Sequence, residues 1–180
     1  MLTIVVPAIE EWNEAEECFI QSKEQVLQLE HSLVSISKWE SKWRIPFLTD
    51  ADKTFEQQID YIRCMTITQH VDSSVYLRLT SDNMAQINKY ISSDLTATTF
   101  GNTRNSRGSR QVVTSELIYY WMVALRIPFE CQKWHLSRLL TLIRVCEEEQ
   151  QPKKKQSRRS IAQRNAALNA ARRAKLHSKG

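Results

Sequence analysis

Residues 114–125, TSELIYYWMVAL, and residues 130–148, ECQKWHLSRLLTLIRVCEE, carry the clearest helical pattern in the chain. The first run is apolar almost throughout, after a Thr-Ser-Glu opening that is typical of a helix N-terminus. The second run places on one side Leu136, Leu139, Leu140, Ile143 and Cys146. Because Pro128 separates the two runs, we expect a helical hairpin at the core of the fold. A helix that is apolar all round lies in the centre of a fold or at a partner interface.

Upstream of this hairpin, the sequence predicts further helices and a small β region. The helices are expected over residues 32–44, 53–65 and 83–91. Alternation over residues 2–6 and short apolar runs at 18–21 and 25–30 predict three antiparallel strands, with 22–24 as a hairpin connection. The glutamate-rich segment 10–17 is expected to be a solvated loop. With only 3 Gly and 4 Pro in 180 residues, tight turns are too few for a large sandwich or barrel.

The charge divides the chain into two parts near residue 150. Residues 151–180 hold ten Lys or Arg and no acid, which leaves 15 basic and 20 acidic residues in the first 150. The net charge of +5 therefore combines a body of −5 with a tail of +10. We expect an α+β protein, mostly α, with a single folded domain over 1–150. Within it, residues 1–30 form a small antiparallel β hairpin or sheet, and residues 31–150 form a helical bundle. Residues 151–180 form a basic tail, disordered or marginally helical, because its large apolar residues are too few to fold alone.

Three interpretations of the basic tail stay open on charge alone. It binds nucleic acid through phosphate neutralisation, it docks on an acidic protein surface, or it is a solvated end that aids solubility. The tail contains no aromatic residue, so base stacking is not available to it.

Motifs of catalysis and of cofactor binding are absent from the sequence. It has no GxSxG, GxGxxG or P-loop pattern, and its four histidines are scattered, so we expect no enzyme activity and no cofactor. Cys131 and His135 are four residues apart, but no second ligand pair accompanies them, so we expect a buried cysteine and a helix-face histidine rather than a metal site. The polar segment 93–111 is expected to be an exposed, mobile loop rather than a phosphate cradle.

Membrane insertion and secretion are not indicated. No apolar run reaches 18 residues, and the N-terminus lacks the basic region of a secretory signal. The four cysteines form no CxxC pair, so we expect reduced thiols in a cytosolic compartment.

Aromatic and basic residues supply the candidate binding groups. We expect Trp121 and Trp134 in the core, whereas Trp39 and Trp43 fit either a core or an interface. The candidate partner-binding residues are Trp39, Trp43, Tyr119, Tyr120, Arg158, Arg159, Arg172 and Arg173.

Several stretches resemble one group of proteins. They are residues 27–43 (LQLEHSLVSISKWESKW), 45–48 (IPFL), 115–122 (SELIYYWM), 127–146 (IPFECQKWHLSRLLTLIRVC) and 165–173 (NAALNAARR). Together they resemble small proteins from the tail module of tailed bacteriophages, most closely tail assembly chaperones. The resemblance runs along nearly the whole chain.

The resemblance implies a non-catalytic role in building the phage tail. Such chaperones coat the long helical tape-measure protein until tail-tube subunits polymerise around it. The resemblance therefore implies the tape-measure protein and the tail-tube protein as partners, and it is compatible with self-association. It also implies action in the host cell cytoplasm and absence from the mature virion. The alternatives are a minor structural or connector protein of the phage tail or neck, and a nucleic-acid-binding protein that acts through the basic tail.

Overall fold

The structure is a computed structural model that describes residues 1–13, 18–49, 51–100, 112–150 and 158–176. The chain divides into two compact units, residues 1–147 and residues 148–180. Seven α-helices, one 3-10 helix and four short strands lie within the described residues. The predicted fold class, mostly α with a small N-terminal antiparallel sheet, is confirmed.

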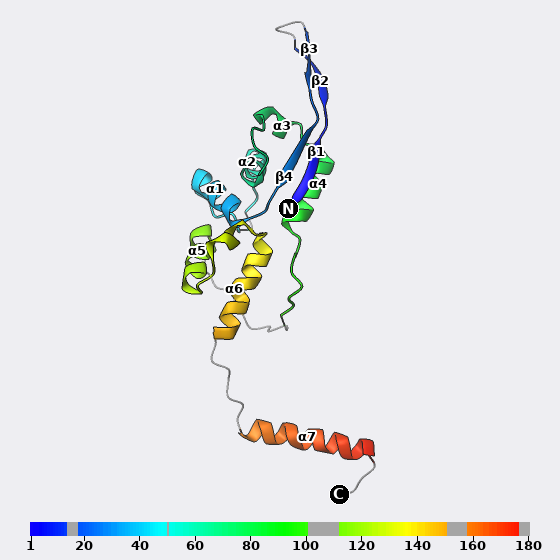
Figure 1. The fold of residues 1–180 in the computed structure, drawn as a ribbon, viewed down its shortest axis with the longest axis vertical. Coiled ribbons are helices and arrows are strands. Elements are labelled where there is room, and N and C mark those ends of the chain that lie inside the picture. The colour runs from blue at the N-terminus through cyan, green and yellow to red at the C-terminus, as the bar shows by residue number, and fades with distance from the viewer. Residues whose placement is uncertain (14–17, 50, 101–111, 151–157, 177–180) are drawn as a thin grey trace. The chain divides into compact units, whose positions relative to one another are not determined.

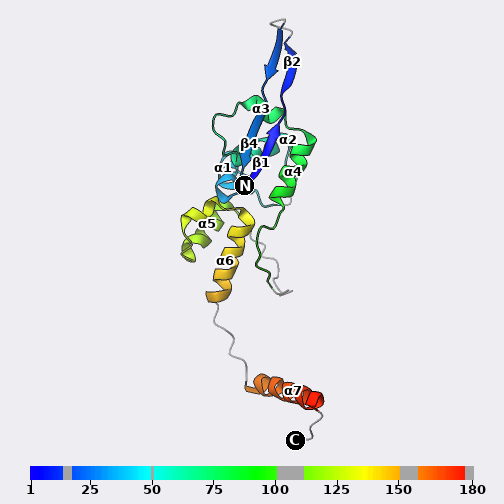
Figure 2. The ribbon, with the colours of Figure 1, turned by 45° about the vertical axis from the view of Figure 1, so that its right-hand side comes forward.

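The N-terminal β structure is an antiparallel ribbon in two parts. Strand β1 (Leu2–Val6) pairs with β4 (Gln25–Leu29), and β2 (Ile9–Asn13) pairs with β3 (Cys18–Ser22). The β2–β3 part extends away from the helices (Figures 1 and 2). The prediction that residues 22–24 form a hairpin connection was wrong, because the strands on either side of them pair with β2 and β1. Strand β2 was missed because its glutamates suggested a loop. The ladder is interrupted at Pro7, which has no N–H to donate.

The β1–β4 part belongs to the core. Ile4, Val6, Leu27 and Leu29 are buried, whereas the alternate residues point to solvent. The chain after α2 continues this sheet at the edge of β4, where the Ile67 N–H donates to the Gln28 carbonyl at 2.8 Å. The alternating pattern that predicted the strand over residues 2–6 therefore reflects one buried face and one exposed face.

Helix α1 (Leu33–Trp43) is the helix on which the others assemble. Helices α2 (Phe55–Met65) and α5 (Ser115–Ala124) and the 3-10 helix η1 (Phe129–Lys133) all pack against it. Two further helices, α3 (Ser73–Leu77) and α4 (Ser81–Ile91), complete this region, and α4 packs beside β1. The core therefore centres on α1 rather than on a hairpin of the two later helices alone.

The predicted helix over 130–148 is two elements. Helix η1 ends at Lys133, and α6 (Leu136–Gln150) begins after a break at Trp134 and His135. At this break the Leu136 N–H donates to the His31 carbonyl at 2.8 Å, and His135 forms an isolated bridge with Ser32. Tertiary pairing with the start of α1 thus replaces the local helical bonds. The predicted apolar stripe is retained, with Leu136, Leu139 and Ile143 buried.

The second unit contains α7 (Arg158–Leu176). Every side chain described in this helix, from residue 162 to residue 176, is exposed to solvent. Residues 93–100 of the predicted loop form neither helix nor strand, and residues 101–111 lie outside the described part of the chain.

Candidate functional site

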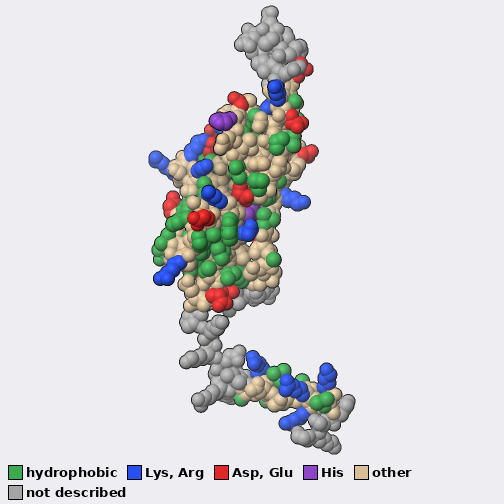
Figure 3. Space-filling view, viewed as in Figure 1, with side chains coloured by type: hydrophobic (Ala, Val, Ile, Leu, Met, Phe, Trp, Pro, Cys, Tyr) green, Lys and Arg blue, Asp and Glu red, His purple; other side chains and the backbone are tan. Residues whose placement is uncertain are grey.

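An aromatic surface covers α5 and the start of η1. Tyr120 is 65% exposed, Val123 60% and Phe129 52%, which are large fractions for apolar side chains on a folded body. Tyr119 is partly buried beside them, with its ring centroid 6.3 Å from that of Phe129. We call these four residues the α5 face. Figure 3 shows hydrophobic side chains gathered over the part of the body that holds α5 and α6. An exposed apolar patch of this kind is typical of a protein interaction site.

The opposite side of α5 is firmly anchored. Ser115, Ile118 and Met122 are completely buried, one turn apart. The first backbone N–H of the helix, that of Ser115, donates to Oε2 of Glu40 at 2.8 Å. Because the buried side and the N-terminus of α5 are fixed in the body, the α5 face keeps its position without a partner.

Glu40 joins three parts of the body. Its Oε1 accepts the Phe47 N–H at 2.7 Å, while Oε2 accepts the Ser115 N–H. The carboxylate is buried at 7% exposure, so these bonds replace its water shell. It also lies at the N-terminus of α5, where a negative charge is favourable. Glu40 therefore fixes both the loop after α1 and the start of α5.

The C-terminus of α5 ends in a Schellman motif. The Ile127 N–H donates to the Met122 carbonyl at 2.8 Å, and the Arg126 N–H donates to the Val123 carbonyl at 3.1 Å. Arg126 takes the left-handed conformation, with φ of 56°. This motif turns the chain so that Phe129 follows beside Tyr119.

A buried polar cluster lies where α1, α2, α4 and α6 meet. The rings of His31 and His135 are 5.1 Å apart, and His31 Nδ1 hydrogen-bonds the Tyr61 hydroxyl at 2.5 Å. The Nε2 of His135 lies 3.1 Å from the Tyr90 carbonyl, which can only accept, so this nitrogen carries the proton. The Tyr90 hydroxyl donates to Glu30 at 2.7 Å.

The electrostatics of this cluster keep both imidazoles neutral. Burial, together with a smaller repulsion from His135, lowers the pKa of His31 to about 4. Burial also lowers the pKa of His135, although its bond to the Tyr90 carbonyl opposes this effect. The pKa of the Tyr61 hydroxyl is raised by burial. The cluster therefore links pH to the stability of the body.

A cavity of about 340 Å³ opens between the loop after α1, α2 and α4. Its apolar lining is formed by Phe47, Tyr61, Ile62, Met84, Ile87 and Ile91. Lys53 lies at its edge, with Nζ 4.6 Å from the centre of the Phe47 ring. An apolar floor with a polar edge accommodates an apolar side chain or a small amphipathic molecule.

The structure separates the predicted binding residues. Tyr119 and Tyr120 lie together on the α5 face. Trp39 is completely buried in the core, so it is not available to a partner, and half-buried Trp43 donates its Nε1–H to Asp60 at 2.9 Å. Arg172 and Arg173 are exposed on α7. The side chains of the other two predicted arginines, Arg158 and Arg159, lie outside the described residues.

The assignment of the other two tryptophans to the core needs correction. Trp134 is 38% exposed and carries the Arg138 guanidinium over its ring at 4.8 Å. Trp121 is half-buried and packs against the core from its edge. Trp121 lies three residues after Ile118 and one before Met122, so helical spacing places it at the edge of the buried side of α5 rather than at its centre.

Sequence reasoning missed Val123 and Phe129. Val123 lies one helical turn after Tyr119 and Tyr120, so the helical period alone places it on the same surface. No periodicity places Phe129 on this surface, because its position depends on the turn at Arg126.

No protein family, curated protein or solved structure matches this chain. Among the described residues, no three His, Cys, Asp or Glu side chains gather in a way that would hold a metal ion. A search of the same residues finds no helix with the length and apolar character needed to cross a membrane.

Proposed function

We propose that this protein is a non-catalytic tail assembly chaperone of a tailed bacteriophage, and that its α5 face binds apolar helical segments of the tape-measure protein. The resemblance of residues 27–43, 45–48, 115–122, 127–146 and 165–173 to such chaperones supports the role. The observation that carries the proposal is the exposed α5 face on a helix whose other side is fixed in the core.

The size of the α5 face suits reversible binding. Burying a large apolar side chain contributes about 1.5–3 kcal/mol, and association itself costs a substantial part of that gain. A face built on three well-exposed side chains therefore gives weak contacts, which become effective when many copies coat one long chain. Such contacts release the tape-measure protein when tail-tube subunits polymerise around it. The chaperone then acts in the host cytoplasm and does not remain in the virion.

Co-expression with the tape-measure protein tests this proposal. We expect the wild-type protein to keep the tape-measure protein soluble and to co-purify with it. A double variant, Tyr120→Ser with Val123→Ser, should lose both effects while it remains folded. Phe55→Ser is the matched control, because Phe55 is 66% exposed on α2, another element.

Two results would contradict the proposal. The first is equal capture of the tape-measure protein by the wild type and by the double variant. The second is the presence of this protein in purified virions, which would indicate a minor structural or connector protein of the tail or neck.

A further inference from the structure

We infer that α7 binds double-stranded DNA by entering the major groove, an activity separate from the proposed function of the α5 face. The first observation is charge. Helix α7 lies in a segment of 30 residues with ten Lys or Arg and no acid. Arg164, Arg172, Arg173 and Lys175 are all exposed. A surface of this composition attracts a polyanion.

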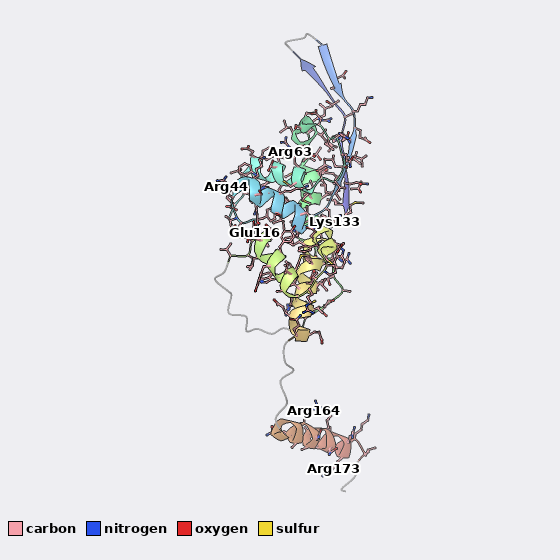
Figure 4. All side chains as sticks on the ribbon, turned by 60° about the vertical axis from the view of Figure 1, so that its left-hand side comes forward. Arg44, Arg63, Glu116, Lys133, Arg164 and Arg173 are labelled. Atoms are coloured by element: carbon pink, nitrogen blue, oxygen red, sulfur yellow. The ribbon has the colours of Figure 1, made fainter. Side chains whose placement is uncertain are left out.

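The second observation is how these charges are distributed around the helix. Arg164 and Lys175 are eleven residues apart, which is close to three full turns, so they share one side of α7. Arg173 is nine residues from Arg164, which places it on the opposite side. Figure 4 shows Arg164 and Arg173 on opposite sides of α7. Between these two flanks lie the small side chains of Ala167, Ala170 and Ala174, together with Gln163 in the first turns, all exposed.

This two-sided arrangement favours a groove over a flat surface. An acidic protein surface meets one side of a helix, so it pairs with Arg164 and Lys175 or with Arg173, but not with both flanks. The major groove of DNA is about 12 Å wide, admits an α-helix and has a phosphate backbone on each side. The alanines let the helix approach closely while the basic side chains reach both backbones.

Other polyanions fit α7 less well. The major groove of duplex RNA is deep and narrow and does not admit a helix in this way. Single strands are bound largely through stacking on aromatic rings, which α7 lacks. A membrane surface requires a continuous apolar face, whereas Leu168 lies between Arg164 and Arg172 on the same side.

The test is fluorescence anisotropy with the full-length protein and a labelled DNA duplex of about two helical turns, in a salt series. We expect the logarithm of the affinity to fall linearly with the logarithm of the salt concentration. Arg164→Gln and Arg173→Gln should each reduce the slope by about 0.9, because each removes one phosphate contact. Tyr120→Ser should leave DNA binding unchanged. A failure of the DNA-binding inference is therefore distinguishable from a failure of the proposed chaperone role.

A steric variant tests whether the alanine side enters the groove. Ala167→Leu keeps the charge and the helical propensity but places a bulky side chain between the two basic flanks. It should weaken duplex binding several-fold, whereas Asn169→Leu, on the other side of α7, should not.

Several outcomes would overturn the inference. One is equal affinity for the duplex and for single-stranded DNA, duplex RNA or polyglutamate under the same salt. Another is a reduced slope for only one of the two arginine variants, which would indicate one-sided contact with an acidic surface. A third is equal binding by Ala167→Leu and Asn169→Leu.

Discussion

At the scale of single residues, Glu40 holds separate parts of the body together through two backbone hydrogen bonds. Glu40→Ala leaves the N–H groups of Phe47 and Ser115 without an acceptor inside the body. Each buried donor that loses its partner costs about 1–3 kcal/mol, so we expect the two together to lower the free energy of unfolding by roughly 2–6 kcal/mol. Urea denaturation measures this loss.

Glu116→Ala is the matched control for that prediction. Glu116 is an exposed glutamate in the first turn of α5, so its removal should cost less than about 1 kcal/mol. Equal losses for the two variants would show that the carboxylate of Glu40 does not have the role described.

A second residue-scale prediction concerns pH. The pKa of His31 is lowered from 6.5 to about 4 in the folded state, so the unfolded chain binds the proton more tightly. Stability is therefore complete above pH 6.5 and falls as the pH drops from 6.5 toward 4. Between about pH 7 and pH 5 the loss should be roughly 2 kcal/mol, measured as urea midpoints across that range.

Two variants compare His31 with an exposed histidine. His31→Gln removes the titrating group, so stability should depend less steeply on pH even if it is lower at neutral pH. His70 is exposed, and His70→Asn should keep the wild-type slope. An unchanged slope in His31→Gln would contradict the assignment.

The residue scale also shows which parts of the site the sequence could predict. Tyr119 and Tyr120 were predicted as binding residues, and they lie together on an exposed surface. Trp39 could not be placed, because a tryptophan on a helix is compatible with both core and interface. The buried position and the role of Glu40 could not be predicted from the sequence, since its two partners lie seven and 75 residues away along the chain.

At the scale of elements, the ribbon formed by β2 and β3 is an extension of the body. Val6 of β1 and Gln25 of β4 already pair with each other. Replacing residues 7–24 with Asn-Gly would therefore connect these two residues through a two-residue hairpin turn. One contact that is lost is the hydrogen bond that Arg78 donates to the Pro7 carbonyl at 3.0 Å. We expect the shortened protein to unfold cooperatively, with a free energy of unfolding that differs from the wild type by less than about 1 kcal/mol in urea denaturation.

Leu27→Ala is the comparison for that prediction. Leu27 is completely buried on β4, and its truncation should cost about 2–5 kcal/mol. A ribbon replacement that is as damaging as Leu27→Ala would show that β2 and β3 are part of the core.

Element boundaries were predictable where local patterns decide them. The alternation in 2–6 and the Thr-Ser-Glu opening of α5 gave elements that the structure confirms. The break at Trp134 and His135 was not predictable, because bonds to residues 31 and 32 impose it over a sequence with helical periodicity. Helix α1 begins with a capping box at Ser32, in which Ser35 supplies the reciprocal bond that a glutamate more often makes.

At the scale of the whole molecule, the division of the chain into two compact units predicts the effect of removing the tail. The described side chains of α7 are exposed, and the first compact unit ends at Glu147. A chain ending at Gln150 should therefore unfold cooperatively with the same urea midpoint as the full-length protein. A lower midpoint or a broadened transition would show that residues 151–180 contribute to the stability of the body.

The central claim is that the α5 face contacts the tape-measure protein, and site-specific photo-crosslinking tests it most directly. A photo-crosslinking amino acid is placed at Tyr120, and in a matched protein at Lys89, which is exposed on α4. In cells that co-express the tape-measure protein, we expect a covalent product from position 120 and none from position 89. No product from position 120, or equal products from both positions, would contradict the account.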